Sequence, residues 1–513
     1  MFGRDKQELL ISVAPGRFGQ SISRRDLLRL GGGLAVGVGL VSVAACGSTR
    51  SGGGTTATAS DVQSFESYPG LHPATVNIGL NHGGQSSGLI LMSSYFGAGQ
   101  QGPIILDGDG QLVWFKEVSG SGDALRAFNL KAETYQGEPV LTWYEGPVVS
   151  GHGQGHYEIM DKSYSEVAVV EAGNGYKGDL HEFFLTPQGT AFFTCYGTGY
   201  ADLSSLGGGK HAPYFYGVAQ EVDVKTGKVL FQWRSDEHIA FAESYAPVPK
   251  DGTTPWDYFH INSMSLSGSD DLLISSRHTW TVFKVSRRSG AVLSRMGGKK
   301  SDFKFGTGAA YAWQHDVTQQ PDGRVTVFDN GTGLYVTQPE SRGLVLAVDD
   351  ASGTVSLVHA YPHPGNALRA GALGSVQVLP DGHIFVGWGV HAWYTEFEPD
   401  GTAVLDGNLT GSATQSYRAF RFPWTGRPAE PPRVAVKPIG EGMTVFAAWN
   451  GATGVKRWAV LAGNGPSRLR TVKTAAKNGF ETAIAVEARA RCVAVAALDA
   501  AGQQLGISAT ITS

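Results

Sequence analysis

Residues 313–330 read WQHDVTQQPDGRVTVFDN, and this stretch decides the fold. Pro321-Asp322-Gly323 joins two short apolar segments, because Pro, Asp and Gly favour the backbone angles of a tight hairpin turn. Similar turns, each followed by an apolar segment, stand at Pro187-Gln188-Gly189, Gly268-Ser269-Asp270 and Pro380-Asp381-Gly382. One hairpin therefore recurs along the chain.

A second kind of turn alternates with the first. It stands at Lys225-Thr226-Gly227, Arg288-Ser289-Gly290, Ala351-Ser352-Gly353 and Pro399-Asp400-Gly401. Weaker pairs precede them, at Gln85-Ser86 with Asp107-Gly108 and at Tyr135-Gln136 with Asp161-Lys162. Each of the six pairs predicts two hairpins, and a four-stranded unit repeated in this way is typical of a propeller blade.

The chain is therefore predicted to be all-β, with a six-bladed β-propeller over residues 71–430 whose ring runs from about Thr75 to Pro423. Two insertions, 197–217 and 238–257, are expected to form loops over one face. The remaining residues, 431–513, contain short apolar segments after a Pro pair and predict a small β-sandwich like a fibronectin type III or immunoglobulin module.

The N-terminal residues 1–46 have the layout of an export signal. Ser23-Arg24-Arg25-Asp26-Leu27-Leu28 precedes a Gly-rich apolar run, as in a twin-arginine signal. Val43-Ala44-Ala45-Cys46 then resembles a lipobox, so Cys46 is the expected site of lipidation. Residues 47–70 form the predicted flexible linker. We therefore expect an exported protein, lipid-anchored to the outer face of the cytoplasmic membrane.

Composition excludes several other classes of protein. The formal net charge is −4, and no basic stripe of the kind that binds nucleic acid is present. Cys195 and Cys492 fall in different predicted domains, so no structural disulfide is expected. Nothing in the sequence demands a cofactor or metal, and membrane contact is expected through the lipid anchor alone.

Three histidines share one position in the repeat. His181 and His315 each precede the central residue of the following turn by seven positions, and His260 precedes Ser269 by nine. Because the first strand of each blade lines the axis of a propeller, these imidazoles are expected to converge there. Arg277 follows the same turn on the next strand and supplies a fixed positive charge. The alternative is that each imidazole merely fills a polar niche.

Other candidate sites are weaker. His152 and His156 have a spacing that would ligate metal on a helix, but the glycines around them favour a loop. Asp107-Gly108-Asp109-Gly110 resembles part of a calcium loop but stands where a hairpin turn is needed. The sequence therefore predicts no metal site.

Several of these segments are similar to the arylsulfotransferase family, bacterial propeller enzymes that move a sulfuryl group between phenols without a nucleotide donor. The likeness spans most of residues 75–425 and rests on six matching segments: Leu180-His181-Glu182-Phe183, His260-Ile261-Asn262-Ser263-Met264, Ser276-Arg277-His278, Gln314-His315-Asp316, Trp388-Gly389 and Phe420-Arg421-Phe422-Pro423-Trp424. Unlike the better-known branch of the family, this chain has its predicted sandwich after the propeller.

The resemblance implies a role for each matched residue. His315 corresponds to the nucleophile that becomes transiently sulfated, and His181, His260 and Arg277 correspond to residues that bind or protonate around the sulfuryl group. Substrate contacts are expected from the neighbours Asn262, His278, Trp280, Tyr311 and Trp313, of which the aromatic ones would form walls for an aryl ring.

The predicted function is nucleotide-independent transfer of a sulfuryl group from an aryl sulfate ester to a phenol, through a sulfohistidine in a ping-pong reaction. Two alternatives remain at this point. The first is a non-catalytic propeller lipoprotein that binds a ligand at the cell surface. The second is an aryl sulfate hydrolase, in which water replaces the phenol.

Overall fold

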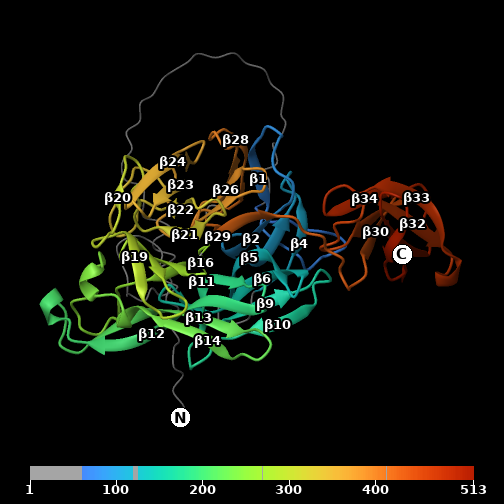
Figure 1. Ribbon diagram of the computed structural model, residues 1–513. Helices are drawn as coiled ribbons and strands as arrows, with labels where there is room; N and C mark the ends of the chain where they lie inside the picture. The colour runs from blue at the N-terminus through green and yellow to red at the C-terminus, as the bar shows by residue number, and fades with distance from the viewer. Residues whose placement is uncertain (1–60, 119–124, 269, 412, 513) are drawn as a thin grey trace, which may run out of the picture.

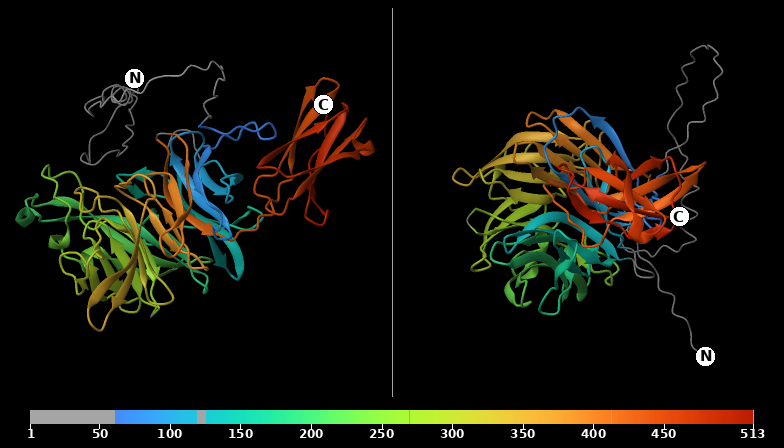
Figure 2. Two further views of the ribbon diagram at one scale, coloured as in Figure 1. Left: turned by 90° about the horizontal axis from the view of Figure 1, so that it is seen from above. Right: turned by 90° about the vertical axis from the view of Figure 1, so that its right-hand side faces the viewer.

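The computed structural model describes residues 61–118, 125–268, 270–411 and 413–512, and these consist almost entirely of β-strands. The strands form a ring of sheets with a smaller module beside it (Figures 1 and 2). Four short 3-10 helices also occur, at Ser204–Leu206, Ser235–Glu237, Phe241–Glu243 and Pro466–Arg468. The predicted signal, Cys46 and most of the predicted linker lie outside the described residues.

Six mainly antiparallel sheets make up the described part of the ring, and in each the first-named strand lies at the axis. The first sheet contains β29 (Gln415–Phe422), β2 (Leu89–Phe96), β3 (Gly102–Leu106) and β4 (Leu112–Phe115). The second contains β5 (Arg126–Tyr135), β6 (Glu138–Gly146), β9 (His156–Met160) and β10 (Glu166–Val170). The third contains β11 (Gly178–Leu185), β12 (Thr190–Ala201), β13 (Ala212–Asp223) and β14 (Val229–Arg234), and β15 (Trp256–Asp257) pairs with β13.

The next three sheets follow the same plan. The fourth sheet contains β16 (Ile261–Leu266), β17 (Leu272–Ser276), β18 (Thr281–Val285) and β19 (Val292–Gly297). The fifth contains β21 (His315–Gln319), β22 (Val325–Asp329), β23 (Arg342–Asp349), β24 (Thr354–Pro362) and β20 (Lys304–Phe305). The sixth contains β25 (Ser375–Val378), β26 (Ile384–Gly387), β27 (Trp393–Phe397), β28 (Ala403–Leu409) and β1 (Val76–Asn81). This topology confirms the predicted all-β propeller class, and we interpret each sheet as one blade.

Burial along a sheet explains the sequence pattern. Second strands such as β17 and β22 are buried at every residue, because neighbouring sheets cover both of their faces. The outer strand β14 instead alternates half-buried and exposed residues over most of its length. The apolar runs that follow the turns are therefore the layers that pack between blades.

The ring closes in a way that the turn pattern did not predict. β1 pairs with β28, and β29 pairs with β2, so strands from the two ends of the ring complete two sheets. The predicted hairpin at Gln85-Ser86 is wrong, because β1 and β2 belong to different sheets. The axial partner of β2 comes instead from the far end of the chain.

One predicted insertion is also corrected. Residues 197–217 are mostly strand, since β12 and β13 pair from Thr190 and Asp223 out to Ala201 and Ala212. The segment 238–257 does contain irregular backbone, and its last residue, Asp257, reaches the axis. A loop prediction from Gly and Pro content therefore held for only one of the two insertions.

A buried cluster of charges joins the six axial strands. Arg418 on β29 contacts Glu182 on β11 at 2.9 Å, Asp316 on β21 at 3.3 Å and, at 3.4 Å, the carbonyl of Asn262 on β16. Lys131 on β5 donates to Glu182 at 3.1 Å, and the N–H of Val376 on β25 donates to Asp316 at 2.8 Å. The guanidinium is thus the centre of a network that touches every axial strand.

The C-terminal module consists of two sheets. One is formed by β30 (Arg433–Ile439), β31 (Gly442–Ala448) and β34 (Glu481–Val486). The other is formed by β33 (Arg470–Ala476), β32 (Arg457–Gly463), β35 (Cys492–Leu498), β36 (Gln504–Ile507) and β37 (Ile511–Thr512). Val445 and Ile484 of the first sheet share a buried cluster with Trp458 and Val495 of the second, so the sheets pack face to face.

Two further findings bear on the expectations above. Cys195 and Cys492 are both buried, and neither forms a disulfide within the part of the chain that the structure describes. None of the helices in the described part of the chain has the length and hydrophobicity needed to cross a bilayer.

We predict that Arg418→Met destabilises the propeller by about 3–5 kcal/mol, because Glu182 and Asp316 would lose their shared buried cation. Arg324→Met is the matched control, since Arg324 pairs with Asp322 at the surface, and it should cost at most about 1 kcal/mol. Urea unfolding measures both free energies. Equal losses in the two variants would contradict the proposed role of Arg418.

Candidate active site at the propeller axis

The three predicted histidines stand at the axial strands. His181 lies on β11, His315 is the first residue of β21, and His260 directly precedes β16. The rings of His181 and His260 are 4.9 Å apart between centroids. The Tyr417 ring on β29 lies 5.9 Å from His181 and 6.4 Å from His315, so it stands between them. Imidazoles from distant segments thus gather around one aromatic side chain.

The backbone is distorted where these side chains turn toward the axis. Register shifts interrupt the pairing of β11 with β12, β16 with β17 and β21 with β22 at or beside the site residues. His260, Trp280, Trp313 and Leu373 adopt positive φ angles of 52°, 53°, 59° and 69°. Such bulges and left-handed conformations are costly outside Gly and concentrate at functional sites, where they aim side chains.

A carboxylate orients His181. Its Nδ1 lies 2.7 Å from Asp179 Oδ2, which also accepts the hydroxyl of Thr194 at 2.9 Å, while Oδ1 accepts the N–H of Gly153 at 2.6 Å. Burial raises the pKa of Asp179, but His181 and these hydrogen bonds outweigh it and the pKa is lowered. The ionised carboxylate therefore keeps a proton on Nδ1 and leaves Nε2 of His181 for proton transfer.

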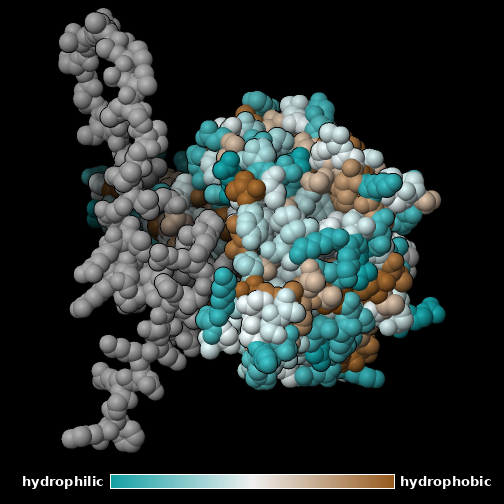
Figure 3. Space-filling view, turned by 90° about the vertical axis from the view of Figure 1, so that its left-hand side faces the viewer, coloured by the Kyte–Doolittle hydropathy of each residue, from teal (hydrophilic) through white to brown (hydrophobic). Residues whose placement is uncertain are grey.

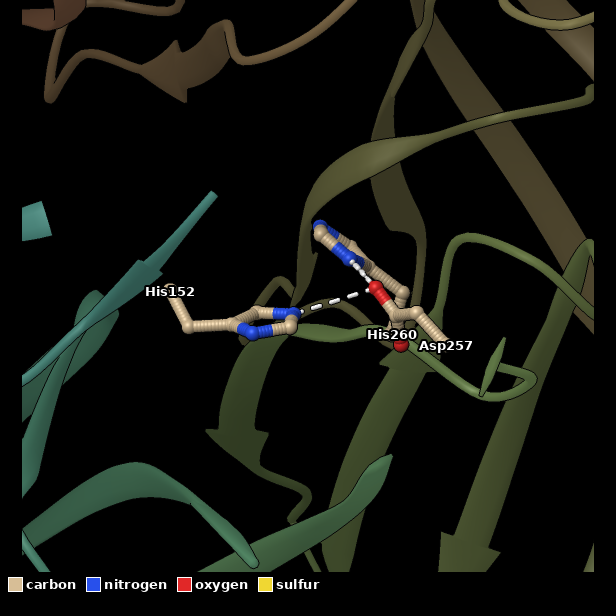
Figure 4. A group of neighbouring side chains, drawn as sticks. All are labelled: His152, Asp257 and His260. Atoms are coloured by element: carbon tan, nitrogen blue, oxygen red, sulfur yellow. Dashed lines mark hydrogen bonds and ion pairs between the residues drawn. The ribbon is translucent and has the colours of Figure 1, made fainter. Parts of the chain in front are cut away.

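A second carboxylate orients His260. Asp257 Oδ2 lies 2.5 Å from His260 Nδ1 and 3.1 Å from His152 Nε2 (Figure 4). The Asp257 pKa is well below its usual range, because the attraction of His260, His152 and His278 outweighs burial, which raises it. His260 itself stays neutral, since burial lowers its pKa more than Asp257 raises it.

Arg277 contributes the positive charge of the site. Its Nη1 donates to His278 Nε2 at 2.8 Å and its Nη2 to the Gly371 carbonyl at 2.7 Å, while the guanidinium lies 5.1 Å from the centre of the Trp313 ring. Its Nε is buried without a hydrogen-bond partner among the described residues. Burial lowers the pKa of Arg277 to about 10 and that of His278 to about 4, so at neutral pH the first is a cation and the second is not.

His315 differs from the other two histidines in its partner. Its Nδ1 lies 2.7 Å from the amide oxygen of Asn330 and 3.1 Å from the Trp313 carbonyl, so Nδ1 carries the proton. Its Nε2 accepts the N–H of Leu373 at 3.1 Å. Burial first, and then the positive charge of Arg277, hold the pKa of His315 well below its usual range. The ring is therefore neutral, with a lone pair on Nε2.

The partners thus divide the histidines by chemistry. Carboxylates bind the Nδ1 of His181 and of His260, whereas the neutral amide of Asn330 fixes the tautomer of His315 and raises its pKa less than burial and Arg277 lower it. A neutral imidazole is a nucleophile, and a carboxylate-paired one can give and take protons. The same arrangement contains a fixed cation, so it suits the transfer of an anionic group.

One group of side chains could also hold a metal ion. Ligand atoms of His152, Asp257 and His260 all lie within 4.8 Å of one another (Figure 4). Two imidazoles and a carboxylate are a donor set that zinc or iron accepts. The contacts between them are already hydrogen bonds that fix His260, and they involve His152 rather than the His152–His156 pair considered from sequence. His156 bonds Glu158 instead, at 3.0 Å.

The other predicted substrate residues divide into two groups. Trp313 contacts His278 at 5.9 Å and Trp280 at 5.2 Å between ring centroids, and Trp280 stacks on Tyr245 at 3.7 Å.

Asn262 is fully buried and donates to the Gln314 carbonyl at 2.6 Å, so it joins β16 to β21. Tyr311 donates to the Met296 carbonyl and packs on Phe305, and its contacts among the described residues are with this packing layer.

Sequence reasoning missed the groups that orient the histidines. Asp179 precedes His181 by two positions and Asp257 precedes His260 by three, and this short spacing was an available signal. Asn330 directly follows β22, Tyr417 lies on β29, and Leu373 lies in a loop of another blade. Only the folded ring shows that these three residues reach His315.

Comparison with known proteins identifies the family. The model of the arylsulfotransferase (ASST) family matches residues 131–410, more than half of the chain, and the protein belongs to this family. The family is one of enzymes, which supports an aryl sulfotransferase activity. A search of curated proteins gives no match.

Solved structures with a similar fold are distant. They include a protein of unknown function from Bacteroides caccae (TM-score 0.40, 12% identity, covering 65% of this chain and 98% of that one). Virginiamycin B lyase from Staphylococcus aureus gives 0.33 and 11%, covering 72% and 95%. A periplasmic gluconolactonase from Pseudomonas aeruginosa gives 0.35 and 13%, covering 78% and 99%. Likenesses at this level carry no inference about function.

We predict that Asn330→Asp raises the pKa of His315 by about 1–3 units, because a carboxylate beside Nδ1 stabilises the imidazolium. The neutral form of His315 would then dominate only at correspondingly higher pH. NMR titration of ring-labelled histidines, with His315 assigned from His315→Gln, measures the shift. The exposed Asn464→Asp is the control and should leave the titration unchanged. An unshifted His315 in Asn330→Asp would show that Asn330 does not set its protonation.

Proposed function

We propose that this protein transfers a sulfuryl group from an aryl sulfate ester to a phenol, with His315 as the nucleophile that carries the group between them. The observation that supports this most strongly is the neutral, Asn330-bound imidazole of His315 beside the Arg277 cation and two carboxylate-paired histidines. The family match supports the same class of reaction.

Donor binding would replace contacts that the protein makes with itself. Arg277 and His315 both bind the backbone of residues 371–373, through the Gly371 carbonyl and the Leu373 N–H. Asn330 holds the same loop through the carbonyls of Ala370 and Leu373, at 2.8 and 2.9 Å. A sulfate ester competes for Arg277 and for the Leu373 N–H, since its oxygens accept both, and this exchange uncovers Nε2 of His315.

The first displacement transfers the sulfuryl group to the protein. Nε2 of His315 forms a bond to sulfur while the bond from sulfur to the aryl oxygen breaks, and protonated His181 gives its Nε2 proton to the departing phenolate. The proton on Nδ1 of His315 stays in its bond to Asn330. Arg277 holds the sulfuryl oxygens, and His260 holds them too once its Nε2 takes up a proton from solvent as the anion binds.

The second displacement regenerates the enzyme. A phenol enters, His181 removes its proton, and the phenol oxygen bonds to sulfur as the bond to His315 Nε2 breaks. Protons and electrons balance over the two steps, since His181 recovers the proton that it gave. The stacked pair Trp280 and Tyr245, together with Trp313, is the aromatic surface nearest to Arg277 and would accommodate the aryl rings.

We also propose that the reaction takes place outside the cytoplasm. The twin-arginine segment and Cys46 predict export and lipidation at the outer face of the membrane. Fourteen residues, 47–60, separate Cys46 from the first described residue, Asp61, and their Gly, Ser and Thr content suits a flexible tether.

Residues 47–513, incubated with a chromogenic aryl sulfate, should release the phenolate only slowly alone and rapidly when a second phenol is added. Initial rates at varied donor and acceptor should give the parallel reciprocal plots of ping-pong kinetics. His315→Asn should lose activity by about 10³-fold or more, because the nucleophile is absent. His82→Asn, which alters an exposed histidine, should retain full activity.

Two other results would each support a different function. Release of free sulfate at the full rate without any phenol would make the protein an aryl sulfate hydrolase. Saturable binding of aryl sulfates with no turnover, in wild type and His315→Asn alike, would make it a binding protein. Full transfer activity in His315→Asn would exclude a sulfohistidine at this position.

A further inference from the structure

The loop that joins β22 to β23, residues 331–341, begins directly after a residue of the site. Asn330, which binds Nδ1 of His315, immediately precedes it. Because β21 and β22 are antiparallel, the loop stands at the end of the blade where β21 begins with His315. The loop is closed on itself, since the Gly331 carbonyl accepts the N–H of Thr337 at 2.7 Å and its hydroxyl at 3.0 Å. The residues between these two therefore project from a fixed base beside the site.

The backbone of this loop lies on the indole ring of Trp313. Trp313 Nε1 donates to the Tyr335 carbonyl at 3.0 Å, and the two rings are 6.0 Å apart between centroids. Gly333 permits this close approach, because a Cβ at that position would come within 2.6 Å of the indole. Arg277 lies 5.1 Å from the centre of the same indole ring. The position of Tyr335 is therefore fixed relative to the cation of the site.

The tip of the loop is apolar and exposed to solvent. Tyr335 and Val336 are 51% and 60% exposed, and no other two large hydrophobic residues at consecutive positions are both exposed in the described part of the chain. On the side of the molecule shown in Figure 3, hydrophobic residues are intermixed with hydrophilic ones. Ligand sites typically combine apolar walls with a few polar groups, so an exposed apolar pair beside a charged site suits contact with a ligand.

A row of aromatic rings connects this tip to the rest of the site. Beyond Tyr335 and Trp313, the row continues with Trp280, 5.2 Å from Trp313, and ends with Tyr245, on which Trp280 stacks at 3.7 Å. Tyr245 is half-buried and is also contacted by the ammonium of Lys299, 4.8 Å from its ring centre. Free aromatic surface is therefore offered at the opposite end of the row, by Tyr335.

We propose that Tyr335 and Val336 bind the second ring of substrates that contain two fused or linked aromatic rings, an inference that rests on the proposed sulfuryl transfer at His315. With its sulfate at Arg277, such a substrate places its first ring beside the indoles and its second ring against the exposed tip of the loop.

Contact with the second ring stabilises the complex because it removes apolar surface of both partners from water. A substrate with a single ring leaves Tyr335 and Val336 exposed and gains nothing from them. The loop therefore determines specificity for the size of the aryl group, and bicyclic aryl sulfates and phenols are the favoured class of substrate.

Isothermal titration calorimetry of the full chain with two inert arylsulfonates tests this proposal. In a sulfonate the sulfur is bonded to carbon, so neither ligand can pass its sulfur group to His315. Naphthalenesulfonate should bind about tenfold more tightly than benzenesulfonate, because only the larger ligand buries a second ring. Tyr335→Ser should reduce this preference to about threefold or less, whereas Tyr335→Phe, which keeps the ring, should retain it.

Leu293→Ser is the matched control, since Leu293 is also 51% exposed but lies on the outer strand β19. It should bind both sulfonates as the wild type does. Because binding requires no turnover, the preference is measured whether or not the protein transfers sulfuryl groups. Failure of this proposal is therefore distinguishable from failure of the proposed function.

Thermal melting establishes that each variant is folded, so a changed preference reflects the lost side chain. Equal affinity of the wild type for the two sulfonates would overturn the proposal, as would an unchanged preference in Tyr335→Ser or an equal loss in Leu293→Ser. Weaker binding of both ligands to the same extent in Tyr335→Ser would also overturn it, since the loop would then support the site as a whole instead of contacting a second ring.

Discussion

The propeller depends on bringing six axial strands together around one buried guanidinium. Arg418 lies on β29, the strand that closes the ring, and the carboxylates it contacts belong to blades formed much earlier in the chain. An unpaired charge in this position would be very costly, so the network is satisfied only when the ring is closed. Tyr417, the neighbouring residue, donates to the carbonyls of His181 and Asn262 and supports the histidines above it. Ring closure and site assembly are therefore one event.

Above this layer, the site uses the same side chain type for different tasks. His181 and His260 each have an aspartate at Nδ1, and His315 has the amide oxygen of Asn330. All three are buried, and the partner at Nδ1 fixes the tautomer of each ring and leaves its Nε2 for chemistry. A cation at Arg277 then favours an anionic substrate, which the acidic surface of the propeller would otherwise repel.

Much of this organisation could be predicted from sequence, because propellers repeat. Turns such as Pro321-Asp322-Gly323 located the hairpins, and their spacing brought His181 and His315 into register. The prediction was wrong at Gln85-Ser86, where pairing depends on a strand more than 300 residues away. Local composition contains no signal for that partner. Residues 197–217 were expected to be a loop, yet a long hairpin satisfies their backbone hydrogen bonds.

The sequence identified the histidines and Arg277 as candidate site residues but not the residues that bind and orient them. Asp257 closes an irregular insertion, and the contact of Leu373 with His315 requires a loop from another blade, so neither follows from a repeat. Tyr311 illustrates the opposite error: an aromatic residue close to His315 in sequence serves packing, because its hydroxyl is bound by Met296. The position of a residue in the repeat predicts that it lies at the axis, whereas the orientation of its side chain depends on tertiary contacts.

Peptide mass spectrometry after a brief incubation with an aryl sulfate, in the absence of any phenol acceptor, tests the division of roles most directly. The account predicts one added sulfuryl group on the peptide that contains His315, its absence in His315→Asn, and its removal when a phenol is added before quenching. A sulfuryl group on His181 or His260, or steady transfer with no modified histidine, would contradict it.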